Sequence, residues 1–297
     1  MAKRTHTLTL TNGKTIKVHE KIRFRPYMAV FYVLLVIFAA IVIVPIWWMV
    51  ANSFETIRSY AFPNPPNFWP KNFTWNNYKL VMMNTSIMAN LKNSAAVTGL
   101  DVVLNLFIAS IAGFVFSKGR FPGKKVLLLM IMSSMMVPFE IKLMPIFNII
   151  QAMGLNNTYL GASLPGSLTA AFNIFMIKKF CDDLPDALLE SAVVDGASKF
   201  RTFLQIYLPL MGPIIATLTV TTVMASWNDL LWPMIVLSKT EMRTVQVGLS
   251  SLTNSTFGPH SGMTCAASCL SILPLAVIFV FMQKYIVQSV AATGIKQ

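Results

Sequence analysis

Hydrophobic residues occur along this chain in long runs that are separated by shorter polar stretches. The first run, Tyr27 to Val50, contains no charged residue and would be about 36 Å long as a helix, which is enough to cross a bilayer with some tilt. Five further runs have a similar character: Ala95 to Phe116, Val126 to about Leu143, Tyr159 to Ile177, Ile206 to Trp227, and Thr264 to Met282. The pattern predicts an all-α polytopic membrane protein with six transmembrane helices.

The stretches around these runs differ in character. Residues 51–88 are rich in Pro, Asn and aromatic side chains, which indicates an ordered loop outside the membrane. Pro45 is expected to kink the first helix, and a short interfacial helix is expected to follow the third run, up to Met153. Pro209 and Pro213 fall in the first turns of the fifth run, and Pro274 lies within the sixth.

The N-terminal residues follow a different period. Hydrophobic positions alternate around Leu8 and Ile16, and Asn12-Gly13 stands between the two halves. Asn-Gly between alternating runs predicts a short β-hairpin with a type I′ turn. We therefore divide the chain into a cytoplasmic extension, residues 1–26, and one membrane domain, residues 27–297.

Composition supports the membrane class. Hydrophobic residues make up 55% of the chain, charged residues make up 12%, and the mean hydropathy is +0.61, which together exclude an ordinary soluble domain. The net charge of +13 comes from Lys and Arg residues that flank the apolar runs, which is typical of membrane proteins and not of nucleic-acid binding. Because no nucleotide-binding loop, metal-spaced Cys/His set or catalytic constellation occurs, we expect no enzymatic activity and no bound cofactor.

Lysine and arginine also predict the orientation of the chain. Placing the N-terminus inside puts most of the 24 basic residues in cytoplasmic segments. With six crossings, both termini are then cytoplasmic, and so is the charged stretch from Asp182 to Pro209.

That stretch contains a spaced motif. Glu190-Ser191-Ala192 is followed after three residues by Gly196, and after nine more by Ile206-Tyr207-Leu208-Pro209. Asp183 can cap a helix that has Pro185 in its first turn, and Gly196 suits a left-handed stop, so a helix of about eleven residues is expected. Such a helix is too short to span a bilayer and too apolar to stand alone in water. Either a second protein covers it, or it is a plain surface helix with a solvated acid.

The motif resembles the EAA loop of bacterial ABC importer permeases, and the whole chain is similar to the maltose-type (MalG-like) group of carbohydrate ABC importer permeases. Ser191 departs from the second Ala of that pattern. The further segments that carry the resemblance are Asn93-Ser94, Met136 to Glu140, Gly154 to Tyr159, Trp227 to Pro233, and Ala291 to Gly294.

The resemblance implies that the stretch is a coupling helix that docks into an ATPase, with Glu190 paired to a basic residue there. The residues assigned to coupling are Glu190, Ser191, Ala192, Asp195, Gly196, Ile206, Leu208 and Pro209. The implied partners are a second homologous permease that completes a heterodimer, two ATP-binding subunits that bind ATP and Mg, and an extracytoplasmic solute-binding protein. The implied location is the bacterial inner membrane, in contact with lipid and not with nucleic acid.

Two pairs of residues are candidates for the substrate pathway. Asp101 and Asn105 lie four apart within a predicted span, where polar residues are often functional. Trp227 and Asn228 combine an aromatic platform with an amide, which suit sugar faces and hydroxyls. In the alternative, Asp101 bonds to a neighbouring helix near the outer interface, and Trp227 and Asn228 form an interface belt with a helix cap.

Three other functions compete with this hypothesis. An ABC importer for another solute, such as glycerol phosphate or a peptide-like compound, would carry the same coupling motif. An ion-driven secondary transporter would show an inverted repeat and interrupted helices with ion ligands. A membrane-embedded enzyme would need paired acids, histidines or a Cys/His set within its spans.

Overall fold

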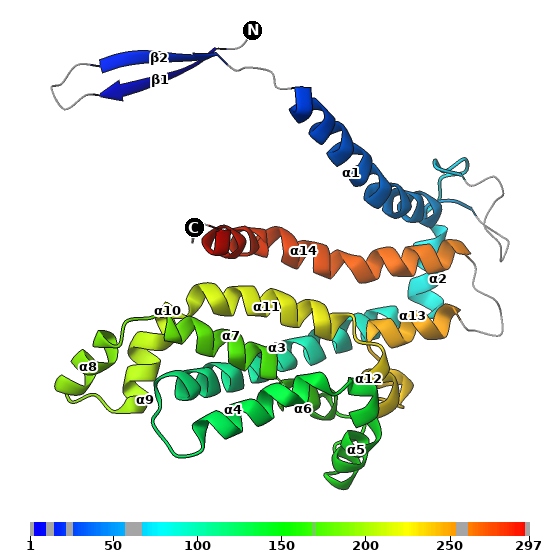
Figure 1. Cartoon of the computed structure of the whole chain (residues 1–297). Coiled ribbons are helices and arrows are strands. Elements are labelled where there is room, and N and C mark those ends of the chain that lie inside the picture. The colour runs from blue at the N-terminus through cyan, green and yellow to red at the C-terminus, as the bar shows by residue number, and fades with distance from the viewer. Residues whose placement is uncertain are drawn as a thin grey trace.

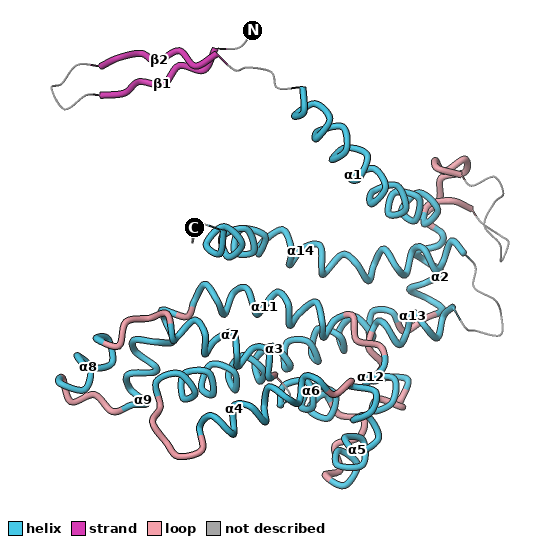
Figure 2. The backbone as a smooth tube through the Cα atoms, in the orientation of Figure 1, coloured by secondary structure: helices cyan, strands magenta, loops and turns pink. Residues whose placement is uncertain are grey.

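The computed structural model describes residues 3–9, 15–21, 26–56, 67–168, 170–253 and 261–294, and most of these residues are helical (Figures 1 and 2). The elements are β1 (Lys3–Thr9), β2 (Thr15–Lys21), α1 (Pro26–Ser53), α2 (Asn76–Asn84), α3 (Ile87–Lys118), α4 (Lys124–Ser133), η1 (Ser134–Met136), α5 (Phe139–Ala152), α6 (Tyr159–Leu168), α7 (Ala171–Asp182), α8 (Ala187–Val194), α9 (Lys199–Thr202), η2 (Phe203–Tyr207), α10 (Leu208–Leu210), α11 (Gly212–Trp227), α12 (Leu231–Val236), η3 (Thr240–Met242), α13 (Val245–Thr253) and α14 (Ser261–Gly294).

Among the described residues, three single helices are long and apolar enough to cross a membrane: Met28–Ser53, Ile87–Lys118 and Ser261–Gln283. Three further apolar stretches are pairs of helices joined at a bend. The bend is 109° between Lys124–Met136 and Phe139–Ala152, 50° between Tyr159–Ser167 and Ala171–Asp182, and 74° between Lys199–Leu210 and Gly212–Trp227. Each predicted run therefore corresponds either to one long helix or to one bent pair.

Proline accounts for two of these bends. Pro138 restricts Val137 to an extended conformation, with φ −89° and ψ 116°, which ends η1 and lets α5 leave in a new direction. Pro213 has no N–H group, so it cannot donate the helical hydrogen bond that would continue α10 into α11. Helix α5 begins at Phe139, within the predicted third run, and ends at Ala152, so it takes up both the end of that run and the short helix expected after it.

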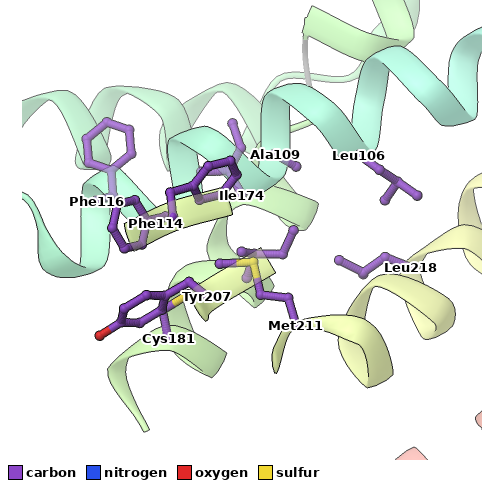
Figure 3. Close-up of a cluster of buried hydrophobic side chains, with 11 residues drawn as sticks. Leu106, Ala109, Phe114, Phe116, Ile174, Cys181, Tyr207, Met211 and Leu218 are labelled. Atoms are coloured by element: carbon purple, nitrogen blue, oxygen red, sulfur yellow. The ribbon is translucent and has the colours of Figure 1, made fainter. Parts of the chain in front are cut away.

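Helix α3 lies at the centre of the packing. It contacts α6, α7 and α11, and the close approach to α7 occurs at Gly113. A cluster of buried side chains fills the junction between α3, α7, η2 and α11, as Figure 3 shows. Its members are Leu106, Ala109, Phe114, Phe116, Ile174, Ile177, Cys181, Phe203, Tyr207, Met211 and Leu218.

The two ends of the helical bundle carry different structures. Helices α8 and α9 lie at one end, whereas α2 and α13 lie at the opposite end (Figure 1). The described part of the predicted loop 51–88 is ordered, because the Glu55 carboxylate accepts hydrogen bonds from the backbone N–H groups of Lys71 (2.5 Å) and Asn72 (3.2 Å). It also contains a helix, α2, which the sequence pattern did not predict, because that segment has almost no hydrophobic periodicity.

At the N-terminus, β1 pairs antiparallel with β2, and Leu8 stands opposite Ile16. The predicted turn residues, Asn12 and Gly13, lie outside the described residues.

Candidate functional site

Helix α8 ends as the sequence predicted. Gly196 adopts a left-handed conformation, with φ 72°. Its N–H group donates to the Val193 carbonyl (3.0 Å), and the N–H group of Ala197 donates to the Ala192 carbonyl (2.9 Å). These two bonds form a Schellman motif, which satisfies carbonyls that the helix end would otherwise leave unpaired.

The start of α8 differs from the prediction. The helix begins at Ala187 and has 8 residues, because Asp183 caps the end of α7 and does not open α8. The Asp183 carboxylate lies 3.5 Å from Lys179, one turn earlier. Asp186 precedes α8 and makes no side-chain capping bond, because its carboxylate binds Lys118 (2.5 Å). That hydrogen bond and charge hold the pKa of Asp186 below its usual range, so it is ionised at neutral pH.

The outer surface of α8 and α9 carries large apolar side chains together with charged ones, among them Glu190, Asp195, Lys199 and Arg201. Val193, Val194 and Phe200 are 60%, 85% and 65% exposed, and Glu190 is also exposed. We call these four residues the α8–α9 patch. Within α8 only Ala192 is buried. Large apolar side chains that are exposed on one short segment are typical of a surface that another protein covers.

The remaining coupling candidates are divided between solvent and core. Ser191 and Asp195 are exposed, and the Ser191 hydroxyl donates to the Leu188 carbonyl (3.2 Å). Ile206 and Leu208 are half-buried against the cluster of Figure 3, whereas Pro209 is exposed.

The most buried residue of this segment, Tyr207, was not among the predicted site residues. It is 0% exposed, and its ring centroid lies 4.8 Å from that of Phe114. Residues Phe203–Tyr207 form a π-helix, a geometry often found at functional joints. The sequence held a signal for this residue, because an aromatic side chain between two apolar motif positions is expected to be core.

Asp101, which is half-buried, and Asn105, which is buried, each make polar contacts with neighbouring helices, and we call this set of contacts the polar network. The Asp101 carboxylate accepts a hydrogen bond from the Ser167 hydroxyl (2.8 Å). Asn105 donates to the Gly166 carbonyl (3.4 Å) and accepts from the Asn173 amide (2.6 Å). Both candidates therefore bond to neighbouring helices within the bundle.

Asp101 also lines a small cavity of about 60 Å³. Asp229 and Ser226, which sequence reasoning did not select, line the same cavity on the side of α11. The other lining residues are Val97, Phe139, Ala162, Pro165, Gly166, Trp232 and Pro233. A cavity of this size, lined by both polar and apolar residues, is too small for a sugar.

Trp227 and Asn228 do not share an environment. Trp227 is 3% exposed, and its indole N–H donates to the Ser271 carbonyl (3.2 Å), so its ring packs in the core. Asn228 is exposed at the end of α11, where its amide donates to the Met224 carbonyl (2.8 Å) and accepts from Gln246 (3.3 Å). In this conformation Trp227 offers no open aromatic face, and Asn228 acts as a helix cap.

Comparison with known proteins places these features in context. The model of the family "Binding-protein-dependent transport system inner membrane component" matches residues 105–292, which include α8 and Asn105 but not Asp101.

Individual relatives cover most of the chain. The arabinooligosaccharides transport system permease protein AraQ of Bacillus subtilis is 34% identical over 76% of this chain and 80% of its own length. The diacetylchitobiose uptake system permease protein DasC of Streptomyces coelicolor is 28% identical over 85% of this chain and 91% of its own length. Among solved structures, a chain of a bacterial ABC transporter involved in the import of the acidic polysaccharide alginate superposes with a TM-score of 0.79. It is 24% identical, and the match covers 90% of this chain and 98% of that one.

Proposed function

The chain belongs to the family of binding-protein-dependent transport system inner membrane components, and from this premise we propose that it is the permease subunit of an ATP-driven importer for a sugar or oligosaccharide. It forms half of the translocation pathway and receives the energy of ATP hydrolysis through α8. Coupling residues on α8 and in the segment after it are Glu190, Ser191, Ala192, Asp195, Gly196, Ile206, Leu208 and Pro209.

The α8–α9 patch is the observation that carries this proposal. A short helix at one end of the bundle exposes Val193 and Val194 beside an acid, while its inner residue Ala192 is buried. Covering the two valines and Phe200 would bury apolar surface, and Glu190 would then need a cationic partner, because an unpaired buried charge costs several kcal/mol. An ATPase groove with an apolar floor and a basic residue fits both requirements.

The distribution of charge supports a cytoplasmic position for α8. The described basic residues near this end of the bundle are Lys118, Arg120, Lys124, Lys125, Lys178, Lys179, Lys199 and Arg201. Loops between membrane spans that are rich in Lys and Arg lie on the cytoplasmic side. Counting each bent pair as one crossing gives six crossings, with both termini on the cytoplasmic side.

The assembly follows from the family. Binding-protein-dependent importers work with a solute-binding protein and an ATPase. We propose that two ATP-binding subunits supply the sites for ATP and Mg, and that a second, homologous permease completes the pathway. Residues 1–26 form a cytoplasmic extension, and residues 27–297 form the membrane domain.

For the substrate route, we propose that it passes beside Asp101 and Asn105 on α3. Asp101 and Asn105 lie in a polar network between helices of the bundle, and polar groups inside the spans of a membrane protein are often functional. The cavity beside Asp101 is small in this conformation, so passage of a sugar requires rearrangement between α3, α6 and α11. Trp227 is buried and so cannot contact a sugar in this conformation, whereas Asn228 is exposed.

The cargo can be tested on the importer's own solute-binding protein. AraQ and DasC carry the names of an arabino-oligosaccharide system and a chitobiose system, so we expect the binding protein of this importer to bind a short oligosaccharide. Calorimetric titration with arabinotriose, diacetylchitobiose, lactose and galactobiose should give micromolar or tighter binding for at least one member of the set. Binding of glycerol phosphate or a dipeptide, with no sugar bound, would refute the cargo assignment.

The coupling role can be tested by substitution of Glu190. In Glu190→Ala the acid that we propose to pair with the ATPase is removed, and Glu190→Lys places two cations together. We expect either variant to reduce recovery of the ATPase with the tagged permease by about tenfold, which corresponds to about 1.4 kcal/mol. The measurement is the amount of ATPase subunit that co-purifies from detergent extracts.

Glu241→Ala is the matched control, because Glu241 is an exposed acid in η3 and not on α8. Its recovery should equal that of the unaltered chain. Full recovery of the ATPase with both Glu190 variants, or equal loss with Glu241→Ala, would remove the basis for assigning coupling to α8.

A further inference from the structure

One lysine connects the proposed coupling helix to the central helix of the bundle. Lys118 is the last residue of α3, and its ammonium group donates to the Leu184 carbonyl (2.8 Å) and to the Asp186 carboxylate (2.5 Å). Both acceptors lie in the short turn between α7 and α8. The Lys118 side chain is only 7% exposed, whereas the Asp186 side chain is 77% exposed, so the ammonium group is held within the fold while its carboxylate partner faces water.

The neighbouring contacts tie α3 and α7 together at the same place. The Ser117 hydroxyl donates to the Asp182 carboxylate (2.7 Å), and Lys178 donates to the other oxygen of the same carboxylate (2.6 Å). At Gly113 the two helices approach so closely that an added Cβ atom would lie 2.6 Å from the Ile177 side chain. The N-terminal side of the α8 segment is therefore fixed to α3 and α7 as one body.

The C-terminal side of the same segment has a different character. It continues through the π-helix Phe203–Tyr207 and then turns by 74° into α11. The Tyr207 hydroxyl is buried and makes no hydrogen bond to any described residue, and in Figure 3 it points away from the cluster. An unsatisfied buried hydroxyl next to a π-helix indicates a joint that can rearrange. The two sides of the α8 segment are therefore held differently.

The far end of α3 is also fixed by polar bonds. The Asn93 amide donates to the carbonyls of Glu241 (2.7 Å) and Arg243 (3.0 Å), and the Ser94 hydroxyl accepts from the Val245 N–H group (2.8 Å). Asn93 and Lys118 are about 37 Å apart along a straight helix. Figure 1 shows α3 running between the end with α8 and the end with α13.

We propose that Lys118 is a positioning residue through which displacement of α8 is passed to α3, and through α3 to the loop 239–245 at the opposite end. This inference rests on the proposed coupling role of α8. Asp101 and Asn105 lie between the two fixed ends, so the same movement reaches the polar network on α3. Because the coupling of binding free energies between two sites is reciprocal, a partner bound at the loop 239–245 also biases the position of α8 against the ATPase.

The test uses the intact importer in nanodiscs, with MgATP hydrolysis measured with and without its solute-binding protein. Lys118→Met keeps the length of the side chain but removes both hydrogen bonds. We expect it to retain the ATPase subunits, to keep its basal rate of hydrolysis, and to lose about fivefold or more of the stimulation by the binding protein. Lys118→Arg can reach the same acceptors and should keep most of the stimulation.

Lys124→Met is the matched control. The Lys124 ammonium also donates to two backbone carbonyls, those of Ser117 (2.8 Å) and Gly119 (2.9 Å), but neither belongs to the α8 segment. Its stimulation should equal that of the unaltered importer. Asn93→Ala, which loosens the other end of α3, should lower stimulation without loss of the ATPase. If Lys118→Met fails to assemble, Asp186→Asn provides the test instead. Asp186 is 77% exposed, so this change leaves the core intact. The Asp186→Asn importer should lose part of the stimulation by the binding protein.

Two results would overturn the proposal. The first is full stimulation of ATP hydrolysis in Lys118→Met, or in Asp186→Asn if only that variant assembles. The second is a loss of stimulation in Lys118→Arg and Lys124→Met as large as that in Lys118→Met, which would indicate general destabilisation. Glu190→Ala separates this inference from the proposed function. Loss of the ATPase in Glu190→Ala, together with normal stimulation in Lys118→Met, refutes the role of Lys118 alone. Normal behaviour of both variants refutes the coupling role of α8 as well.

Discussion

At the scale of single residues, the close contact between α3 and α7 depends on one glycine. A Cβ atom at Gly113 would lie 2.6 Å from Ile177 Cγ2 and 3.0 Å from the backbone nitrogen of Lys178. The backbone atom cannot move aside as a flexible side chain would, so any larger residue must push the two helices apart. The hydrogen bond between Ser117 and Asp182 is 2.7 Å long and lies one turn further along α3. It depends on the short distance between the two helices.

Gly113→Ala is therefore expected to lower the stability of the importer by about 1–3 kcal/mol, the usual cost of an overpacked contact. Gly99→Ala in the same helix is the control. No atom lies within 4 Å of an added Cβ there, so this change should be neutral or stabilising by up to about 1 kcal/mol. Thermal unfolding of the purified complexes measures both effects. An unchanged midpoint in Gly113→Ala would show that α3 and α7 are free to separate.

Residue types in the sequence indicated some of these roles and not others. Gly196 was recognisable because a left-handed helix stop strongly favours glycine. From the sequence, Lys118 is only one of many basic residues that flank the spans on the predicted cytoplasmic side. Its two acceptors lie more than sixty residues away along the chain, and hydrogen-bond partners at that separation leave no pattern in a single sequence. Asp229 was missed for the same reason, since only the fold places it beside Asp101.

At the scale of elements, hydrophobic runs located the helices but not their breaks. Each predicted run contains helix, because about twenty apolar residues in a bilayer must satisfy their own backbone groups. The bends of 109°, 50° and 74° depend on how neighbouring helices pack, and hydropathy does not record packing. Helix α2 has no apolar stripe of sufficient length, and its buried residues, Asn77 and Val81, are held by contacts within the loop and with α14.

Helix α8 shows how one local contact competes with another. Asp183 has the residue type and position of a helix cap, yet Lys179 on α7 is one turn away and takes its carboxylate. The outcome is a helix of 8 residues preceded by a turn that Lys118 holds. The central part of the site, the motif around Glu190, followed from its spacing. The connection of the motif to α3 required the fold.

At the scale of the whole molecule, the two ends of the helical bundle differ in their surface and in their bonds. The end with α8 exposes Val194 and Phe200, and the end with α13 is held by Asn93 and Ser94 on α3. Helix α1 exposes its apolar side chains over most of its length, which suits lipid or a second permease. The arrangement matches a subunit that works between an ATPase on one side of the membrane and a solute-binding protein on the other.

The central prediction is that α8 is a cytoplasmic helix covered by an ATPase. The accessibility of a cysteine placed at Val194 measures the position and the coverage of α8 directly. Cys181 and Cys265 are buried and Cys269 is half-buried, so the parent chain gives the labelling background. We expect Val194→Cys to resist a membrane-impermeant maleimide in intact cells, to react in inverted vesicles stripped of the ATPase, and to be protected again when the ATPase is added back. Labelling in intact cells, or labelling that the ATPase does not reduce, would contradict the account.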